Sequence, residues 1–243
     1  MSMGTEVGRI AEITRYPVKS MAGVPMSSAL LGWHGVAGDR RFAFRRVGDQ
    51  GNFPWLTASK LPELILYRPE QFDETGGEPL PARVRTPSGS CLPLAGPELQ
   101  AELSGRFGSP VEVMQLRSGI FDDATMSVIS LATIAGIGRS AGLELDRRRF
   151  RENLVVDTAD PDPFSENGWL GRTLVFGDDH SGPALSVTAR DTRCMMINLD
   201  PETARQDPQV LKAVVQLNQK DAGVYATVVR RGTINVGDRV RLL

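Results

Sequence analysis

The sequence feature that most limits the fold is a series of short apolar segments, each closed by glycine, proline or other turn residues. Between Val7 and about Leu116 these segments are "GRIAEITRYPV", "RRFAFRRVGDQGNF", "LILYRPEQF", "ARVRTPSG" and "PVEVMQL". Phe42 and Phe44 alternate with other residues before Gly48 and Asp49, which is typical of a strand that enters a hairpin. The stretch "DETGGEPLP" has no periodicity and indicates a surface loop. We therefore predict that this region is mostly β-structure.

Two segments of the second half have helical spacing instead. Ser130 is suited to cap a helix that Gly142 would end, with apolar positions at Leu131, Ile134 and Ile137. Asp207 and Pro208 are suited to open a second helix, whose apolar stripe is Val210, Leu211, Val214 and Leu217. Two helices are therefore expected.

Strand-like segments surround both helices. They are "NLVVD", "TLVFG", "ALSVTA", "CMMINL", "YATVVRRG" and "RVRLL", and "GTINVGDRVRLL" indicates two strands joined by a turn at Gly237 and Asp238. We expect a mainly β (α+β) protein in which the C-terminal half is a β-barrel with a few covering helices.

Charge and cysteine content exclude several classes of protein. The 28 basic residues nearly cancel the 29 acidic ones, so nothing indicates nucleic acid or an anionic membrane as a partner. No apolar run approaches the roughly 18 to 20 residues needed to span a bilayer, and "MSMGTEVGRI" lacks a signal-peptide pattern. We expect a cytoplasmic protein. Two cysteines without CxxC spacing disfavour a disulfide framework, a zinc site and an iron–sulfur site.

Common catalytic motifs are weak or missing in the sequence. The two histidines, His34 and His180, lie among glycines and polar residues and are expected in surface loops. No GxSxG motif occurs, and the glycine-rich stretch "GIGRSAG" falls inside the first expected helix. A Ser-His-Asp triad and a phosphate-binding loop are therefore disfavoured.

Arginine is the more informative residue type. Arg147, Arg148, Arg149 and Arg151 precede the segment "NLVVD", Arg40 and Arg41 precede "FAF", and Lys19 and Ser20 follow "YPV". In pattern alone, charged residues at strand ends are more often simply solvated. The alternative is a cradle for a phosphate or another dianion, to which guanidinium and ammonium groups are suited. Both readings stay open at this point.

Cys194 also has two readings. A lone cysteine is most often a small buried hydrophobe. A position beside Arg193 at the start of a strand favours partial exposure and a lowered thiol pKa, as a nucleophile or a soft-metal ligand needs. Cys91 lies in a turn-rich stretch without charged residues within four positions, and we assign it no role.

The chain resembles the MOSC superfamily with its N-terminal β-barrel domain. The resemblance rests on these segments in family order: "YPVKSMAG", "GVAGDRRF", "LTASKLPEL", "FDDATMSVISLAT", "RFRENLVVD", "ENGWLGRTLVFG", "RDTRCMMINLDPETA" and "GVYATVVRRGTINVGDRVRLL". It is nearest to the two-domain members that include the mitochondrial amidoxime-reducing component and its bacterial relatives. The resemblance implies an N-terminal β-barrel domain at residues 1–105, packed on a MOSC β-barrel domain at 106–243.

The resemblance also implies a molybdenum cofactor (Mo-molybdopterin), with the Cys194 thiolate as the protein's ligand to the metal. The family's cofactor contacts fall on Lys19, Ser20, Arg40, Ala124, Thr125, Arg151, Asn153, Thr192, Cys194 and Tyr225. In this reading the cofactor phosphate is the dianion that the arginines would hold. Pyridoxal phosphate binding, a property credited to the superfamily, is a further expectation.

The activity that the resemblance implies is reduction of N-hydroxylated compounds: amidoximes, hydroxylamines or N-hydroxylated bases. No ferredoxin-like extension follows "VGDRVRLL", so electrons are expected from a separate flavin or iron–sulfur protein. Ser59 and Lys60 stand where the family usually has an arginine, and Glu152 where proline is common. The alternative is a carrier that uses Cys194 to transfer the molybdenum cofactor or a persulfide.

Overall fold

A seven-stranded β-barrel forms the larger half of the molecule. The computed structural model describes residues 4–179 and 181–243. The barrel strands follow one another in the order β11-β10-β14-β13-β12-β16-β1, and β1 closes the ring by pairing with β11. Their bounds are Thr5–Arg15 (β1), Met126–Ser130 (β10), Leu154–Thr158 (β11), Thr173–Phe176 (β12), Ala184–Thr192 (β13), Asp221–Arg230 (β14) and Arg239–Leu242 (β16). The mainly β fold expected from the sequence is confirmed.

The barrel interior is filled by alternating apolar side chains from all seven strands. Ile10, Val128 and Phe176 belong to one continuous core of buried residues. β1 is bent by irregularities in its register, and Gly8 lies at one of them. A side chain at Gly8 would place its Cβ 2.1 Å from the Asp157 carbonyl oxygen, so only glycine allows β1 to approach β11 this closely.

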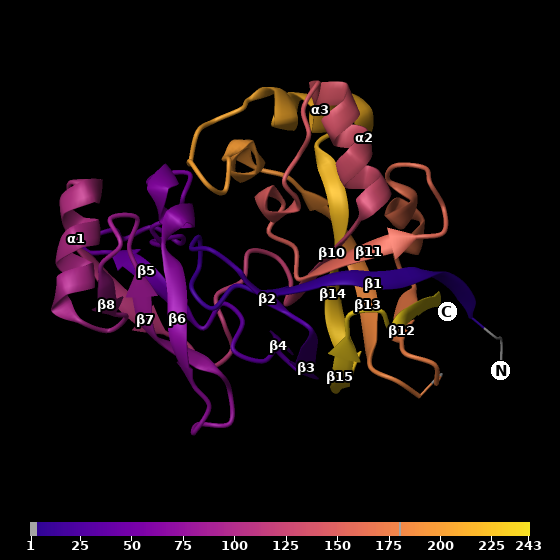
Figure 1. Cartoon of the computed structure of the whole chain (residues 1–243), viewed down its shortest axis with the longest axis horizontal. Helices are drawn as coiled ribbons and strands as arrows, with labels where there is room; N and C mark the ends of the chain where they lie inside the picture. Colours follow the sequence, from indigo (N-terminus) through magenta and orange to yellow (C-terminus); the bar gives the residue numbers. More distant parts are fainter. Residues whose placement is uncertain (1–3, 180) are drawn as a thin grey trace.

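The other half contains small sheets and one helix. Figure 1 shows α1 with β5 to β8 on one side of the molecule and the barrel with α2 and α3 on the other. The elements are β5 (Phe42–Arg46) paired with β9 (Val111–Gln115), the sheet of β6 (Arg68–Asp73), β7 (Leu80–Arg85) and β8 (Cys91–Pro93), η1 (Pro62–Leu66) and α1 (Pro97–Phe107). They enclose a separate core that includes Phe44, Tyr67 and Leu99. The expected N-terminal β-structure is confirmed.

Short strands connect the two halves. β2 (Val24–Met26) extends the barrel sheet beside β1, and β3 (Ser28–Gly32) pairs with both β4 (Gly35–Val36) and β15 (Gly232–Asn235). The start of the chain thus contributes strands to the barrel side. The domain boundary near residue 105 stays a prediction.

The two expected helices are present. α2 (Leu131–Ala141) is capped by the Ser130 side chain, which accepts a hydrogen bond from the Thr133 amide, and ends at Gly142. α3 (Gln209–Asn218) packs against α2 over one opening of the barrel. The expected Asp207 cap of α3 is wrong, because the Asp207 carboxylate pairs with Arg149 at 2.7 Å and no side chain caps this helix.

Two other expectations differ from the structure. The segment "CMMINL" is not a strand, because Met195–Asn198 forms the short 3-10 helix η4. The sequence reading missed α1, which begins with Pro97 and buries only Leu99 and Leu103. The expected order of strand, turn and strand around Gly237 is confirmed, and the two strands, β15 and β16, pair with other strands and not with each other.

The remaining short helices are η2 (Arg147–Arg149) and η3 (Ser165–Trp169). Within the described residues, no helix has the length and apolar character needed to cross a lipid bilayer. His34 is exposed, as expected, and His180 lies outside the described residues.

Candidate functional site

Cys194 lies just beyond the end of β13, as the first residue of the turn into η4, and its side chain is exposed. The backbone is extended here, so consecutive side chains point to opposite sides. Asp191 and Arg193 are accordingly buried, whereas Thr192 and Cys194 face out. Arg193 is therefore not the exposed cation beside the thiol that the sequence suggests, because its guanidinium group points into the protein.

Cys194 borders a cavity of about 360 Å³, within the usual range for small-molecule sites. This Cys194 cavity is lined by nine of the ten residues carried over from the family: Lys19, Ser20, Arg40, Ala124, Arg151, Asn153, Thr192, Cys194 and Tyr225. Thr125 is the exception. Its carbonyl oxygen packs on Gly35, where a side-chain Cβ would lie only 2.4 Å away. The structure thus brings together residues from six separate stretches of the sequence.

Three residues of this cavity have a left-handed backbone, which is uncommon outside glycine. The φ angles are 66° at Ser20, 49° at Arg40 and 59° at Arg151. Such residues are strained and tend to cluster at functional sites, where the surrounding structure holds them. The presence of these three residues around one cavity is an observation that does not depend on the family resemblance.

Three of the cations that line the cavity, Lys19, Arg40 and Arg151, differ in how they are paired. Arg40 contacts the fully buried Asp39 at 2.5 Å and also donates to the Asn153 side chain and the Arg151 carbonyl. Lys19 is buried and pairs at 2.7 Å with Asp122, whose own side chain is 59% exposed. Among the described residues, Arg151 has no carboxylate partner.

The Tyr16 ring takes the place of an anion beside Arg151. The guanidinium carbon of Arg151 lies 4.4 Å from the ring centre, and that of Arg40 lies 5.2 Å from it. Burial lowers the pKa of Arg151 to about 10 and also lowers the pKa of Lys19, because both cations have given up water. A dianion in this cavity would restore the missing charge partner.

A buried ion network supports the wall behind Cys194. Arg193 pairs with Glu152 and, at 3.1 Å, with Asp191, and donates to the carbonyls of Ala222 and Phe150. Burial raises the pKa of Glu152 to about 8 and raises the pKa of Asp191. Because Glu152 and Asp191 share one guanidinium group, the pair of carboxyl groups binds a proton more readily than an isolated carboxyl group does.

The Cys194 cavity has the donor set that a phosphate-bearing molybdenum cofactor requires. An exposed thiol provides a soft ligand of the kind suited to a heavy metal. Arg151 without a carboxylate and Lys19 with a displaceable one provide the charge for a phosphate. Ser20 and Thr192 line the same cavity, and the Thr192 hydroxyl donates to Asp221 at 2.7 Å. These residues fit the group.

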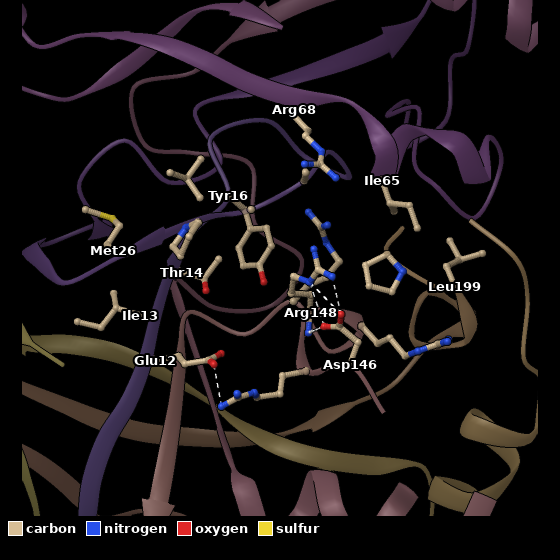
Figure 2. Close-up of a pocket in the computed structure, with 18 of the residues that line it drawn as sticks. Glu12, Ile13, Thr14, Tyr16, Met26, Ile65, Arg68, Asp146, Arg148 and Leu199 are labelled. Atoms are coloured by element: carbon tan, nitrogen blue, oxygen red, sulfur yellow. Dashed lines mark hydrogen bonds and ion pairs between the residues drawn. The ribbon is translucent and has the colours of Figure 1, made fainter. Parts of the chain in front are cut away.

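A second, larger cavity of about 930 Å³ lies on the other side of Arg151. We call it the Tyr16 cavity, after the tyrosine in its lining, and it shares Arg149, Arg151 and Met196 with the Cys194 cavity. Figure 2 shows Tyr16, Glu12 and Arg148 around this space, between β1 and the residues that lead into β6.

Most arginines of the Tyr16 cavity are already paired. Arg148 contacts Asp146 at 2.5 Å and Glu202 at 2.6 Å, and Figure 2 shows the first of these contacts. Arg147 pairs with Glu12 at 2.7 Å, Arg68 with Glu202 at 3.0 Å, and Arg149 with Asp200 and Asp207. Arg147 and Arg148 are about half-exposed, which favours the solvated interpretation for them, whereas Arg149 is buried in its ion pairs. Arg41, likewise, pairs with Glu78.

The sequence reading missed several residues of the Cys194 cavity. Asp122 and Asp123 stand out in the sequence only as part of the family segment "FDDATMSVISLAT", Glu152 only as a departure from the family, and Phe53 only as the end of a strand-like segment. No local signal marks Phe53, because an exposed aromatic residue in a turn has no periodic context. The Lys19–Asp122 pair joins residues 103 positions apart.

Two family models match the chain: the MOSC N-terminal beta barrel domain over residues 7–89 and the MOSC domain over residues 102–241. The human mitochondrial amidoxime-reducing component 1 is 24% identical over 296 aligned residues, which cover 98% of this chain and 84% of that protein. The crystal structure of YuaD from Bacillus subtilis is similar in fold, with a TM-score of 0.53, 15% identity, and coverage of 99% of this chain and 98% of that one.

Proposed function

The chain belongs to the MOSC domain family, and from this premise we propose that it is a molybdenum-cofactor-dependent oxidoreductase that reduces N-hydroxylated compounds. The resemblance to the human amidoxime-reducing component supports the reaction class. Amidoximes, hydroxylamines and N-hydroxylated bases are the candidate substrates. A separate flavin or iron–sulfur protein is the proposed source of electrons.

The observation that carries this proposal is that one cavity contains both an exposed thiol and a buried cation without a carboxylate partner. Cys194 is exposed, whereas Arg151 is desolvated without a carboxylate partner. Burying an unpaired cation costs free energy unless a bound ligand offsets the loss of hydration. A ligand with a metal at one end and a phosphate at the other would satisfy both groups.

Each side chain has a separate task in this reading. Cys194 would bind the metal, and Arg151 with Lys19 would bind the phosphate. Arg40 would hold the Arg151 loop through its bond to the Arg151 carbonyl, at 3.1 Å. When bound, the cofactor would supply the two-electron transfer that removes the oxygen of the N-hydroxyl group. Two electrons and two protons convert N–OH into N–H and one water molecule.

Replacement of Cys194 tests the proposal, and Cys91 offers a matched control. Cys91 lies in β8 beside Arg83, outside the Cys194 cavity. Both variants, Cys194→Ala and Cys91→Ala, are expressed in a host that makes the cofactor. Metal content is measured by inductively coupled plasma mass spectrometry and activity with benzamidoxime and an artificial electron donor. We expect Cys91→Ala to match wild type and Cys194→Ala to lose turnover and at least about tenfold of its molybdenum.

Undiminished molybdenum and turnover in Cys194→Ala would overturn the proposal. The carrier alternative gives a different pattern. A wild-type protein that holds molybdenum, reduces none of the three substrate classes and carries cyanide-labile sulfur on Cys194 would be a carrier instead of a reductase.

A further inference from the structure

The Tyr16 cavity contains a buried hydroxyl group without a hydrogen-bond partner. Tyr16 is only 3% exposed, and Figure 2 shows its hydroxyl pointing into the cavity. Within residues 4–179 and 181–243, no group forms a hydrogen bond with this hydroxyl. Buried polar groups of proteins are nearly always hydrogen-bonded. The Tyr16 hydroxyl is therefore available to bind a polar atom of a ligand.

The neighbours of the Tyr16 ring hold this hydroxyl in position. The guanidinium carbons of Arg151 and Arg40 lie 4.4 Å and 5.2 Å from the ring centre. Gly23 lies at the edge of the ring, where a Cβ atom would be only 2.5 Å from the Tyr16 Cε1 atom. Glycine therefore allows the chain before β2 to pack directly against the ring. A donor that is already held in place loses little conformational entropy when a ligand binds.

The surroundings of the Tyr16 hydroxyl favour a negatively charged acceptor. Burial raises the pKa of Tyr16 to about 12, so the hydroxyl keeps its proton at neutral pH and can donate it in a hydrogen bond. The guanidinium groups of Arg151 and Arg40 lie beside the same ring and make the local potential positive. A hydrogen bond to a charged acceptor is stronger than one to a neutral acceptor. A carboxylate oxygen is therefore suited to this position.

The other charged groups of the Tyr16 cavity limit the charge of a ligand. The arginines at 68, 147, 148 and 149 already contact carboxylates, so a ligand with two negative charges would have to displace some of them. Glu144 forms no ion pair among the described residues, but it is exposed, and solvent screens its charge. A ligand with one negative charge is therefore a better match than a dianion or a cation.

The apolar part of the lining determines the body of the ligand. Figure 2 shows Ile13 and Met26 on one side of the space and Ile65 and Leu199 on the other. These side chains are aliphatic or, in Met26, a flexible thioether that adapts to the shape of its neighbour. Contact with a hydrocarbon chain would remove apolar surface from water on both sides of the space.

We propose that the Tyr16 cavity is a second binding site, separate from the Cys194 cavity, and that it takes an aliphatic monocarboxylate. The carboxylate accepts a hydrogen bond from the Tyr16 hydroxyl, and the hydrocarbon chain lies between the apolar side chains of β1 and β2 and those of Ile65 and Leu199. The cavity volume of about 930 Å³ is large enough for such a ligand. This site goes beyond the proposed function and does not depend on it.

Three probes separate the charge of the ligand from its hydrocarbon chain. Decanoate has the anionic group and the chain, decylammonium has the chain with a positive charge, and butanoate has the anionic group with a short chain. Titration calorimetry on purified wild-type protein is expected to give decanoate an affinity at least about tenfold higher than either other probe. No binding of decanoate, or equal affinities for decanoate and decylammonium, would overturn the inference.

Two tyrosine variants assign the binding to one of the two cavities. Tyr16→Phe removes the hydroxyl but keeps the ring beside Arg151, and we expect it to weaken decanoate about tenfold. Tyr225→Phe removes a hydroxyl from a residue that lines only the Cys194 cavity, and we expect it to keep the wild-type affinity. Unchanged affinity in Tyr16→Phe would contradict the site. A loss in Tyr225→Phe as large as that in Tyr16→Phe would place the ligand in the Cys194 cavity and overturn the inference.

Discussion

The Cys194 cavity and the Tyr16 cavity share a wall, but they use their charged side chains in different ways. The Tyr16 cavity is larger, at about 930 Å³ against about 360 Å³, and several arginines line it. Its arginines at 68, 147, 148 and 149 already contact carboxylates. Lys19, which lines only the Cys194 cavity, pairs with an exposed carboxylate, and Arg151, in the wall that both cavities share, has no carboxylate partner among the described residues. We therefore base the proposal of the Cys194 cavity as the site on its incomplete charge pairing and not on its size.

One ion pair beside each cavity shows a difference in depth. Behind the Cys194 cavity, the side chains of Arg193 and Glu152 are 7% and 1% exposed, whereas Arg148 of the Tyr16 cavity and its partner Glu202 are each 51% exposed. Removing one partner of a buried pair leaves an uncompensated charge, but an exposed pair is replaced by water. Four predictions test this difference.

The largest expected effect is the loss of stability in Arg193→Met. Glu152 and Asp191 would lose their shared cation in a buried setting, at a cost of about 3–5 kcal/mol of unfolding free energy. The matched variant Arg148→Met is expected to cost at most about 1 kcal/mol, because solvent reaches its partners. Urea unfolding followed by circular dichroism measures both values. Equal losses of unfolding free energy in the two variants would contradict the expected difference between the buried and the exposed ion pair.

The next effect concerns ligand binding at the shared wall. In Arg151→Met, the phosphate would lose its only cation without a carboxylate partner, and we expect about tenfold less molybdenum per chain. Arg148→Met is expected to keep the wild-type metal content. Mass spectrometry of metal per chain checks both. If Arg148→Met loses the metal and Arg151→Met keeps it, the site belongs to the Tyr16 cavity.

The same Arg151→Met substitution is expected to change stability in the opposite direction when no cofactor is bound. Arg151 is desolvated and unpaired, so methionine of similar length would raise the unfolding free energy by up to about 1 kcal/mol. Urea unfolding of cofactor-free protein measures this change. A loss of more than about 1 kcal/mol would mean that the Tyr16 contact alone compensates the buried charge.

The smallest expected effect is a pH dependence of stability that comes from Glu152. Burial raises the pKa of this carboxyl to about 8, next to Arg193, Asp191 and Tyr225. A raised pKa means that the folded protein holds the proton more tightly than the unfolded chain. The contribution is complete below the unfolded value of about 4.3 and is lost as the pH rises through about 8. Glu152→Gln is expected to flatten the change in urea midpoint between about pH 5 and about pH 8. An unchanged slope would contradict the raised pKa.

Local patterns predicted the fold better than they predicted the site. The alternating segments and the two stripes at residues 131–137 and 210–217 are properties of neighbouring residues, so the barrel strands, α2 and α3 could be expected. α1 buries only Leu99 and Leu103 and has a weak stripe, which explains why it was missed. Met195–Asn198 has the apolar composition of a strand, but the turn after β13 makes it a 3-10 helix.

The site depends on pairs between residues far apart in the chain. Local pattern does not distinguish Arg148 from Arg151 in "RRRFREN", and although the family resemblance names only Arg151, the structure gives the physical difference: Arg148 contacts Asp146 and Glu202, whereas Arg151 lies over the Tyr16 ring. The family resemblance placed nine residues at the cavity, but Asp122 as the partner of Lys19 and Phe53 at the mouth required the structure. The sequence alone therefore could not show which charged residues form ion pairs with one another.

The position of β1 has a consequence for synthesis on the ribosome. β1 is the first strand made, but its partners in the barrel are β11 and β16, which begin at residues 154 and 239. The barrel therefore cannot close before β16 has been made, although β2 and β11, the other strands that pair with β1, are made earlier. The core around Phe44, Tyr67 and Leu99 draws mainly on residues before 115 and is available much earlier.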